Sequence, residues 1–173
     1  MKTLLFLTAA LANAEVLDSS ASGFTVKTTV QIKAAPDDVF HKFIHNIADF
    51  WNSAHTFSHD AHNLWIEPRA GGCLCEKLPK DGFVRHFELI NFMPGKYIVF
   101  SGAMGPLQSL AVTGTMQIQL TPAEGGTKLE MTYTVSGYSA KGLTSWAAPV
   151  DSVTGEQFKR LKNYIETGGP AAN

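Results

Sequence analysis

The chain has 173 residues and a formal net charge of −1. It is long enough to bury a substantial core within one domain. Its balance of charges excludes nucleic acid as an expected partner, because a basic face would supply most of such affinity. It also contains no polybasic segment of the kind that binds anionic membranes. Small molecules and other proteins remain as partners.

The first fourteen residues have the pattern of a secretory signal peptide. Lys2 gives a positive start, residues 4–12 form an apolar run, and residues 12–14 are a small-x-small cleavage signal. The apolar run is shorter than the roughly 20 residues that span a bilayer. We therefore expect cleavage after Ala14, which would move the formal charge to −2. The mature protein would be periplasmic or secreted, with no membrane insertion.

The mature chain is expected to begin with a loose leader over residues 15–22, followed by a single domain over residues 23–169. Residues 24–33 alternate between apolar and polar side chains, which predicts a half-buried strand. Pro36 then opens a helix, because proline is favoured in the first helical turn. The inward stripe of this helix is expected to comprise Val39, Phe40, Phe43, Ile44 and Ile47. A second short helical stretch follows around Phe50 and Trp51.

Short strands separated by turn residues fill most of the remaining chain. They are predicted at residues 64–67, 73–78, 83–92, 97–102, 112–120 and 128–136. A long amphipathic helix is predicted over residues 143–167, and Gly168 and Pro170 end it. Pro149 removes one backbone hydrogen bond and is expected to kink or divide this helix near Ala148.

The order of these elements predicts an α+β fold. Turns at hairpin spacing indicate a mostly antiparallel sheet. Such a sheet would expose one face to solvent, and it would curve so that its other face packs around the long C-terminal helix. The first half of that helix, which carries Trp146, is expected to form a cavity wall.

Several motifs occur in a characteristic order along the chain. Ala35-Pro-Asp-Asp-Val-Phe40 and Ala48-Asp-Phe-Trp51 come first, and Arg69-Ala-Gly-Gly72 and Pro94-Gly-Lys-Tyr-Ile98 follow them. Residues 113–120, Gly125-Gly-Thr-Lys-Leu129 and the last helix complete the pattern.

In this order the chain resembles the START-like helix-grip (SRPBCC) superfamily, which includes polyketide cyclase-like and Hsp90-activator-like proteins. The resemblance covers essentially all of the mature chain. It implies a deep cavity between the sheet and the last helix that takes an apolar small molecule, and it implies no catalytic signature. The signal peptide distinguishes this chain from cytosolic Hsp90 activators.

The only cysteines are Cys73 and Cys75. Residues i and i+2 on a regular strand lie about 6.5–7 Å apart, too far for a disulfide without a local distortion. We therefore expect two free, partly buried thiols. Their spacing is also not that of a structural zinc site, so we expect no metal.

The predicted hairpin over residues 73–92 has two possible registers. A two-residue loop places Glu76 opposite Arg85, and we favour this register. A three-residue loop places His86 and Glu88 beside Glu76 instead, because a one-residue slip moves every side chain to the other face. In both registers the Glu76 side chain lies on the same face of the hairpin as Leu74 and Leu78.

The residues expected to bind a ligand are the aromatic and polar groups that the fold should bring to the cavity: Trp51, His55, Glu76, Arg85, His86 and Trp146. His59 and His62 are expected in a solvated loop at the cavity mouth. No nucleophile elbow and no phosphate-binding glycine loop occurs, so we expect no cofactor.

These residues support two main functions. The first is an exported binding protein that holds a small apolar molecule, with Glu76 and Arg85 or His86 fixing its polar end. The second is a cofactor-independent cyclase or isomerase that uses a cavity Glu or His as acid–base group. Glu76 beside His86 would favour the enzyme, and Glu76 neutralised by Arg85 would favour binding. An interaction protein with a collapsed cavity is a third possibility.

Overall fold

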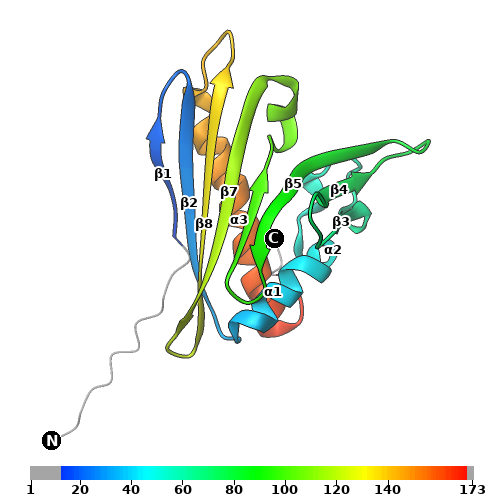
Figure 1. Ribbon diagram of the computed structural model, residues 1–173, viewed down its shortest axis with the longest axis vertical. Coiled ribbons are helices and arrows are strands. Elements are labelled where there is room, and N and C mark those ends of the chain that lie inside the picture. Colours follow the sequence, from blue (N-terminus) through cyan, green and yellow to red (C-terminus); the bar gives the residue numbers. More distant parts are fainter. Residues whose placement is uncertain (1–12, 171–173) are drawn as a thin grey trace, which may run out of the picture.

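The computed structural model describes residues 13–170, which form one curved, unclosed sheet and a long C-terminal helix (Figure 1). The sheet has eight strands in the order β1-β2-β8-β7-β6-β5-β4-β3, and neighbouring strands are antiparallel throughout. The predicted α+β class is therefore confirmed. The strands are β1 (Asn13–Ser19), β2 (Gly23–Ile32), β3 (Leu64–Ile66), β4 (Cys73–Lys77), β5 (Phe83–Met93), β6 (Tyr97–Ser101), β7 (Ala111–Ala123) and β8 (Gly126–Tyr138).

Two helices follow β2, as predicted. Helix α1 (Pro36–His45) begins at its proline, and α2 (Ile47–Phe50) is a single turn that ends before Trp51. The predicted inward stripe of α1 is buried. Four short 3-10 helices lie in the connections: η1 (Ser53–His55), η2 (Ala61–Asn63), η3 (Gly105–Ser109) and η4 (Thr144–Trp146).

Helix α3 (Ala147–Thr167) crosses the inner face of the sheet and buries Val150, Phe158 and Leu161 against it. The helical segment is divided between η4 and α3 at Ala147, close to the predicted position, but Pro149 is not the cause. Pro149 is the third residue of α3, where a missing N–H removes no bond within the helix. Gly168 ends α3 in the left-handed conformation (φ 83°) and donates its N–H to the Tyr164 carbonyl.

The N-terminal edge of the sheet differs from expectation. Residues 15–22 were expected to be loose, but the chain up to Ser19 forms the edge strand β1, paired with β2. All seven residues of β1 are exposed, so the strand has no apolar alternation that would reveal it in the sequence. The predicted signal peptide, apart from its last two residues, lies outside the described residues.

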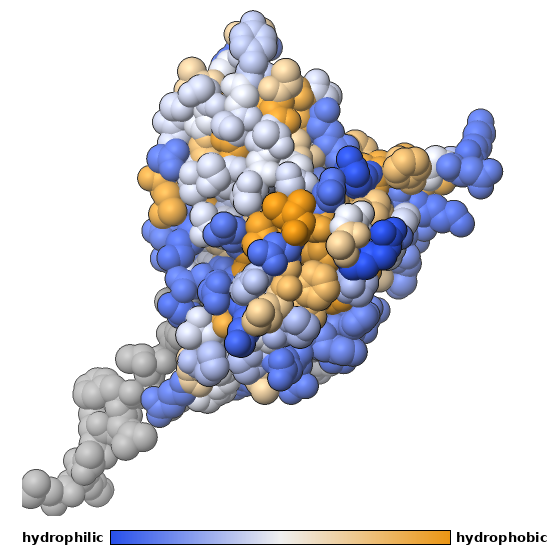
Figure 2. Space-filling model, viewed as in Figure 1, coloured by the Kyte–Doolittle hydropathy of each residue, from blue (hydrophilic) through white to orange (hydrophobic). Residues whose placement is uncertain are grey.

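Within residues 13–170, no helix is both long and apolar enough to cross a bilayer. Figure 2 shows a largely polar face on which apolar side chains gather near the middle, over β5. Phe83, Ile90 and Met93 are the large apolar side chains that β5 exposes.

Candidate functional site

The β4–β5 hairpin combines the two predicted registers. Near the turn, Glu76 pairs with Val84 and Cys75 with Arg85, which is the register of a three-residue loop. Beyond a bulge, Leu74 pairs with Phe87, which is the register of a two-residue loop. The extra residue on β5 is His86. The register that we favoured is therefore wrong at Glu76 and correct at Leu74.

The bulge turns two consecutive β5 side chains, His86 and Phe87, toward the interior. In the interior His86 Nε2 lies 2.9 Å from Glu76 Oε2. Glu76 is completely buried, and His86 is 5% exposed. The buried pair is thus Glu76 with His86, and the arrangement with Arg85 is absent.

Two backbone groups complete the surroundings of Glu76. The Phe57 N–H donates to Oε2 at 3.1 Å, and the Ser58 N–H donates to Oε1. Burial raises the pKa of Glu76, but the hydrogen bonds from Ser58, His86 and Phe57 outweigh it and leave the pKa below its ordinary value. Glu76 is therefore an ionised acceptor that fastens the segment between η1 and η2 to the sheet.

The pKa of His86 is lowered, whereas the pKa of a histidine in an ion pair is usually raised. Burial lowers its pKa below 6.5, and the attraction of the Glu76 carboxylate offsets only part of this effect. The ring is therefore neutral near pH 7. Its one N–H group, at Nε2, donates a hydrogen bond to the Glu76 carboxylate. Phe57 stacks on the ring, with the centroids 5.9 Å apart.

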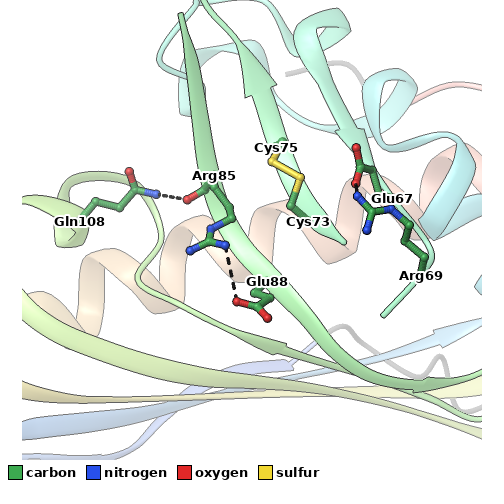
Figure 3. The surroundings of a disulfide bond; sticks show 7 residues. All are labelled: Glu67, Arg69, Cys73, Cys75, Arg85, Glu88 and Gln108. Atoms are coloured by element: carbon green, nitrogen blue, oxygen red, sulfur yellow. Dashed lines mark hydrogen bonds and ion pairs between the residues drawn. A yellow bond between two sulfur atoms is a disulfide. The ribbon is translucent and has the colours of Figure 1, made fainter. Parts of the chain in front are cut away.

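Arg85 lies on the outer face of the hairpin (Figure 3). Its guanidinium is 3.5 Å from the Glu88 carboxylate, and its side chain is largely exposed. Gln108 donates to its backbone carbonyl at 2.9 Å. The structure therefore does not bring Arg85 to the cavity, because the three-residue loop turns the side chain outward.

The expectation of free thiols is also wrong. Cys73 and Cys75 form a disulfide on the same outer face, beside their cross-strand partners Glu88 and Arg85. Their Cα atoms are 5.4 Å apart, closer than on a regular strand. The register shift of the hairpin falls between Leu74 and Cys75, within the bridged segment.

A cavity of about 320 Å³ lies between the hairpin, α3 and the connecting segments. Four of the six predicted ligand-binding residues line it. These are Trp51, His55, His86 and Trp146. Glu76 stands behind His86, and most of the other lining side chains are apolar: Ala54, Phe57, Leu64, Leu74, Met104, Pro106, Leu107, Pro149, Val150 and Val153.

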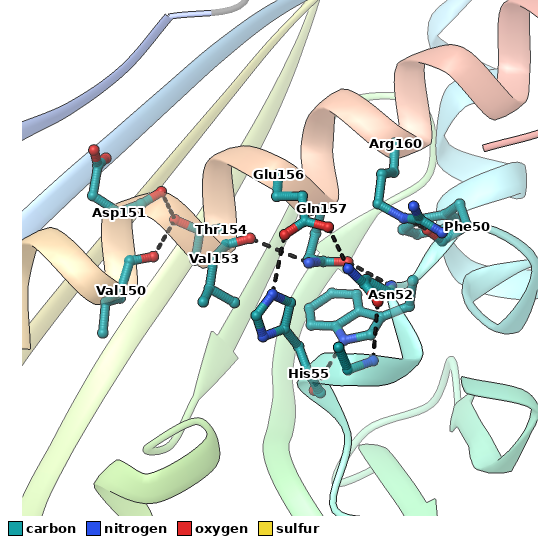
Figure 4. Close-up of polar contacts among 12 residues, drawn as sticks. Phe50, Asn52, His55, Val150, Asp151, Val153, Thr154, Glu156, Gln157 and Arg160 are labelled. Carbon is teal, nitrogen blue, oxygen red and sulfur yellow. Dashed lines mark hydrogen bonds and ion pairs between the residues drawn. The ribbon is translucent and has the colours of Figure 1, made fainter. Parts of the chain in front are cut away.

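Polar contacts with α3 hold one wall of the cavity (Figure 4). Glu156 accepts from the Asn52 amide at 2.5 Å and lies 3.0 Å from His55 Nε2. Gln157 accepts from the Asn52 N–H at 2.8 Å. The Trp51 indole donates to the His55 carbonyl at 3.3 Å. The two predicted residues of this wall are thus positioned by the middle of α3.

Tyr133 holds another wall. Its hydroxyl donates to the Gly102 carbonyl at 3.1 Å and accepts from the Met104 N–H at 3.2 Å. Burial raises the pKa of Tyr133 to about 12, so the hydroxyl stays protonated. Tyr133 therefore fastens the start of the η3 segment, which contributes Leu107 and its neighbours to the cavity.

The other histidines of the loop do not join the cavity lining. His62 pairs with Asp60 at 2.9 Å and is largely exposed, and exposed His59 adopts a positive φ of 58°. Within residues 13–170 no three His, Cys, Asp or Glu side chains gather as metal ligands. This segment therefore contributes His55 to the cavity lining, and His59 and His62 lie outside it.

No protein-family model and no curated protein matches this chain, whereas solved structures do. Protein EF2215 from Enterococcus faecalis, of unknown function, aligns with a TM-score of 0.65 at 15% identity, covering 91% of this chain and 80% of its own. SA2116 from Staphylococcus aureus, also of unknown function, gives a TM-score of 0.62 at 13% identity, covering 84% and 95%.

CalU16 from Micromonospora echinospora aligns with a TM-score of 0.53 at 13% identity, covering 91% of this chain and 87% of its own. At these identities the likenesses establish the fold alone. They name no function for this protein.

Two contributions to the site were missed in the sequence. Phe57 and Ser58 bind Glu76 through backbone N–H groups, for which side-chain chemistry gives no signal. Tyr133 lies within the strand predicted at residues 128–136, and no role was predicted for it. The polar tip of a buried tyrosine needs a partner, and that requirement could have identified its link to the neighbouring loop.

Proposed function

We propose that this protein binds a small apolar molecule in the cavity between the hairpin and α3. The observation that carries the proposal is the composition of the lining. Apolar and aromatic side chains make up most of it, and His86 and Thr56 are its buried polar side chains. The cavity volume lies at the lower end of the range for small-molecule sites.

The signal-peptide pattern supports export to the periplasm or beyond, and an oxidised Cys73–Cys75 bridge is compatible with that compartment. The order of the sequence motifs, together with the sheet and its long helix, supports membership of the START-like helix-grip superfamily.

Native mass spectrometry of protein purified from its own cell envelope tests the binding function. We expect a bound apolar molecule that dissociates on denaturation. Ala54→Trp should reduce its occupancy, because Ala54 lines the cavity and is exposed enough to accept a larger side chain. Ala70→Trp makes the same change at an exposed turn outside the lining and should leave occupancy intact. Equal occupancy in both variants would contradict the proposal.

A second candidate function is supported by the Glu76–His86 pair. A carboxylate that holds one nitrogen of a neutral imidazole leaves the other nitrogen free to take a proton, as in general-base catalysis. Glu76 beside His86 is the pairing that was predicted from the sequence to favour an enzyme. Glu76 also anchors the loop through Phe57 and Ser58, so the pair has a structural role whether or not a reaction occurs.

His86→Gln separates the two functions. Glutamine can still donate to Glu76 and fill the space, but it is not a base at neutral pH. If the protein only binds, the variant should retain the molecule captured from the envelope, unaltered. An enzyme would instead convert that molecule during incubation with wild-type protein, and the variant would not.

A further inference from the structure

The His86 ring has one polar atom without a partner. Nε2 is held by Glu76, whereas Nδ1 is buried and makes no hydrogen bond to any described residue. Buried polar atoms are almost always hydrogen-bonded, so an unpaired one calls for an explanation. The ring also lines the cavity. A bound molecule is therefore a natural source of the missing partner.

The contacts around Glu76 decide which kind of partner Nδ1 can take. Both carboxylate oxygens already accept backbone N–H groups, from Phe57 and Ser58, which is the environment of an ionised acid. An ionised carboxylate can only accept, so His86 must donate from Nε2. In a neutral ring the other nitrogen then carries a lone pair and no hydrogen. Nδ1 is an acceptor.

We propose that the cavity selects an apolar molecule carrying a hydroxyl or N–H group, and that His86 Nδ1 accepts its hydrogen. This inference rests on the proposed binding function and specifies the chemical class of the ligand. A phenol or an aliphatic alcohol fits the requirement. An ether or a hydrocarbon of the same shape leaves Nδ1 unpaired.

The same surroundings disfavour an apolar acid. No lysine or arginine occurs among the described lining residues, and Arg85 points to the outer face. A ligand carboxylate at His86 would meet a lone pair and the nearby charge of Glu76. Burying an unpaired charge is costly, and a like charge close by adds to that cost. The cavity therefore discriminates against fatty and aromatic acids.

Entry of the ligand requires a side chain to yield, because Nδ1 is enclosed in the structure. Phe57 is a neighbour that can yield, because its movement frees space over the face of the His86 ring, beside the edge on which the Nδ1 lone pair lies. It stacks on the His86 ring and lines the cavity, yet it is 47% exposed, so it loses little burial when it swings outward. Its backbone stays fixed to Glu76 while the ring moves.

Three matched probes test the selection: 4-propylphenol, its methyl ether 4-propylanisole, and 4-propylbenzoate. Binding to the full chain is followed by tryptophan fluorescence, because Trp51 and Trp146 line the cavity. Trp65 lies outside the lining, and Trp65→Phe removes its background. We expect the phenol to bind about fivefold or more tightly than the ether, as one hydrogen bond allows, and the benzoate not to bind.

His86→Leu provides the control for the hydrogen bond. The ratio of the ether Kd to the phenol Kd should fall to about the value set by the different sizes and polarities of the two probes, because leucine has no acceptor. His86→Gln keeps an acceptor oxygen and should retain part of the preference. Equal binding of phenol and ether by the wild type would overturn the inference and leave the binding function intact. Failure of all three probes to bind would count against both.

A second measurement needs no variant. Nitrogen-15 spectra of labelled wild-type protein distinguish a protonated ring nitrogen from one with a lone pair. We expect His86 to carry its hydrogen on Nε2 near pH 7, and its Nδ1 signal to shift when the phenol is added but not when the ether is. A hydrogen on Nδ1 in the free protein would refute the inference.

Discussion

Glu76 is the residue whose removal most directly tests this description of the site. In Glu76→Ala three donors lose their acceptor: the Phe57 and Ser58 N–H groups and His86 Nε2. An unsatisfied buried donor costs about 1–3 kcal/mol. The two backbone groups belong to a partly exposed segment that water can reach, so they contribute near the lower limit. His86 is enclosed and contributes near the upper limit.

We therefore expect Glu76→Ala to lower the free energy of unfolding by about 4–5 kcal/mol, within the range for breaking a buried pair. For a domain of this size the loss corresponds to a fall in Tm of roughly 8–20 °C. Urea denaturation gives the free energy, and calorimetry gives Tm. Hydrogen exchange at the Phe57 and Ser58 amides should accelerate more than exchange in β7 and β8.

Glu67→Ala is the matched control. It removes the same type of side chain from an exposed ion pair, in which the Glu67 carboxylate lies 2.8 Å from the Arg69 guanidinium. Exposed pairs contribute about 0–1 kcal/mol, so this variant should change stability little. If the two variants were equally stable, or if the Phe57 and Ser58 amides kept their protection in Glu76→Ala, the assigned role of Glu76 would be wrong.

Two further predictions concern pH and the disulfide. The folded-state pKa of His86 lies below 6.5, so the unfolded chain binds its proton first and stability falls as pH drops below about 6.5, by at most about 1.4 kcal/mol per pH unit. The difference in unfolding free energy between wild type and His86→Gln should be constant above pH 7 and change below it; a constant difference down to pH 5 would contradict this. The Cys73–Cys75 bridge closes so short a loop that we expect its reduction to lower the free energy of unfolding by only about 1–2 kcal/mol. Melting curves with and without reductant measure it, and a Cys73→Ser/Cys75→Ser variant should not respond to reductant.

Most of the fold could be predicted because hydrophobic periodicity reports burial directly. The stripe of α1, the alternation of β7 and β8, and the glycine stop after α3 each depend on residues close together in the sequence. Strand β1 could not be predicted in this way. It is exposed on both faces and pairs only through its backbone with β2, so its side chains carry no signal of the pairing.

The candidate site could be predicted only in part, for a related reason. Trp51, His55 and Trp146 line the cavity because the order of elements brings their segments to one end of α3, and that order is visible in the sequence. Whether Arg85 or His86 joins Glu76 depends instead on a one-residue difference in a turn. Lys80 and Asp81 both adopt positive φ, a conformation that aspartate favours but lysine does not, and this preference does not fix the length of the loop.

The bulge at His86 explains why neither register alone was sufficient. A hairpin without it would place either the Glu76–His86 pair or the apolar Leu74–Phe87 pair inside, since alternation allows only one phase along β5. The extra residue changes the phase between them, so the polar pair and the apolar face occupy the same side of the hairpin. Such a bulge disrupts the ladder and is most readily explained by what it positions. Here it positions the one buried imidazole in the cavity lining, which is why His86, rather than the more conspicuous Arg85 or the cysteines, is the residue through which a ligand should be sought.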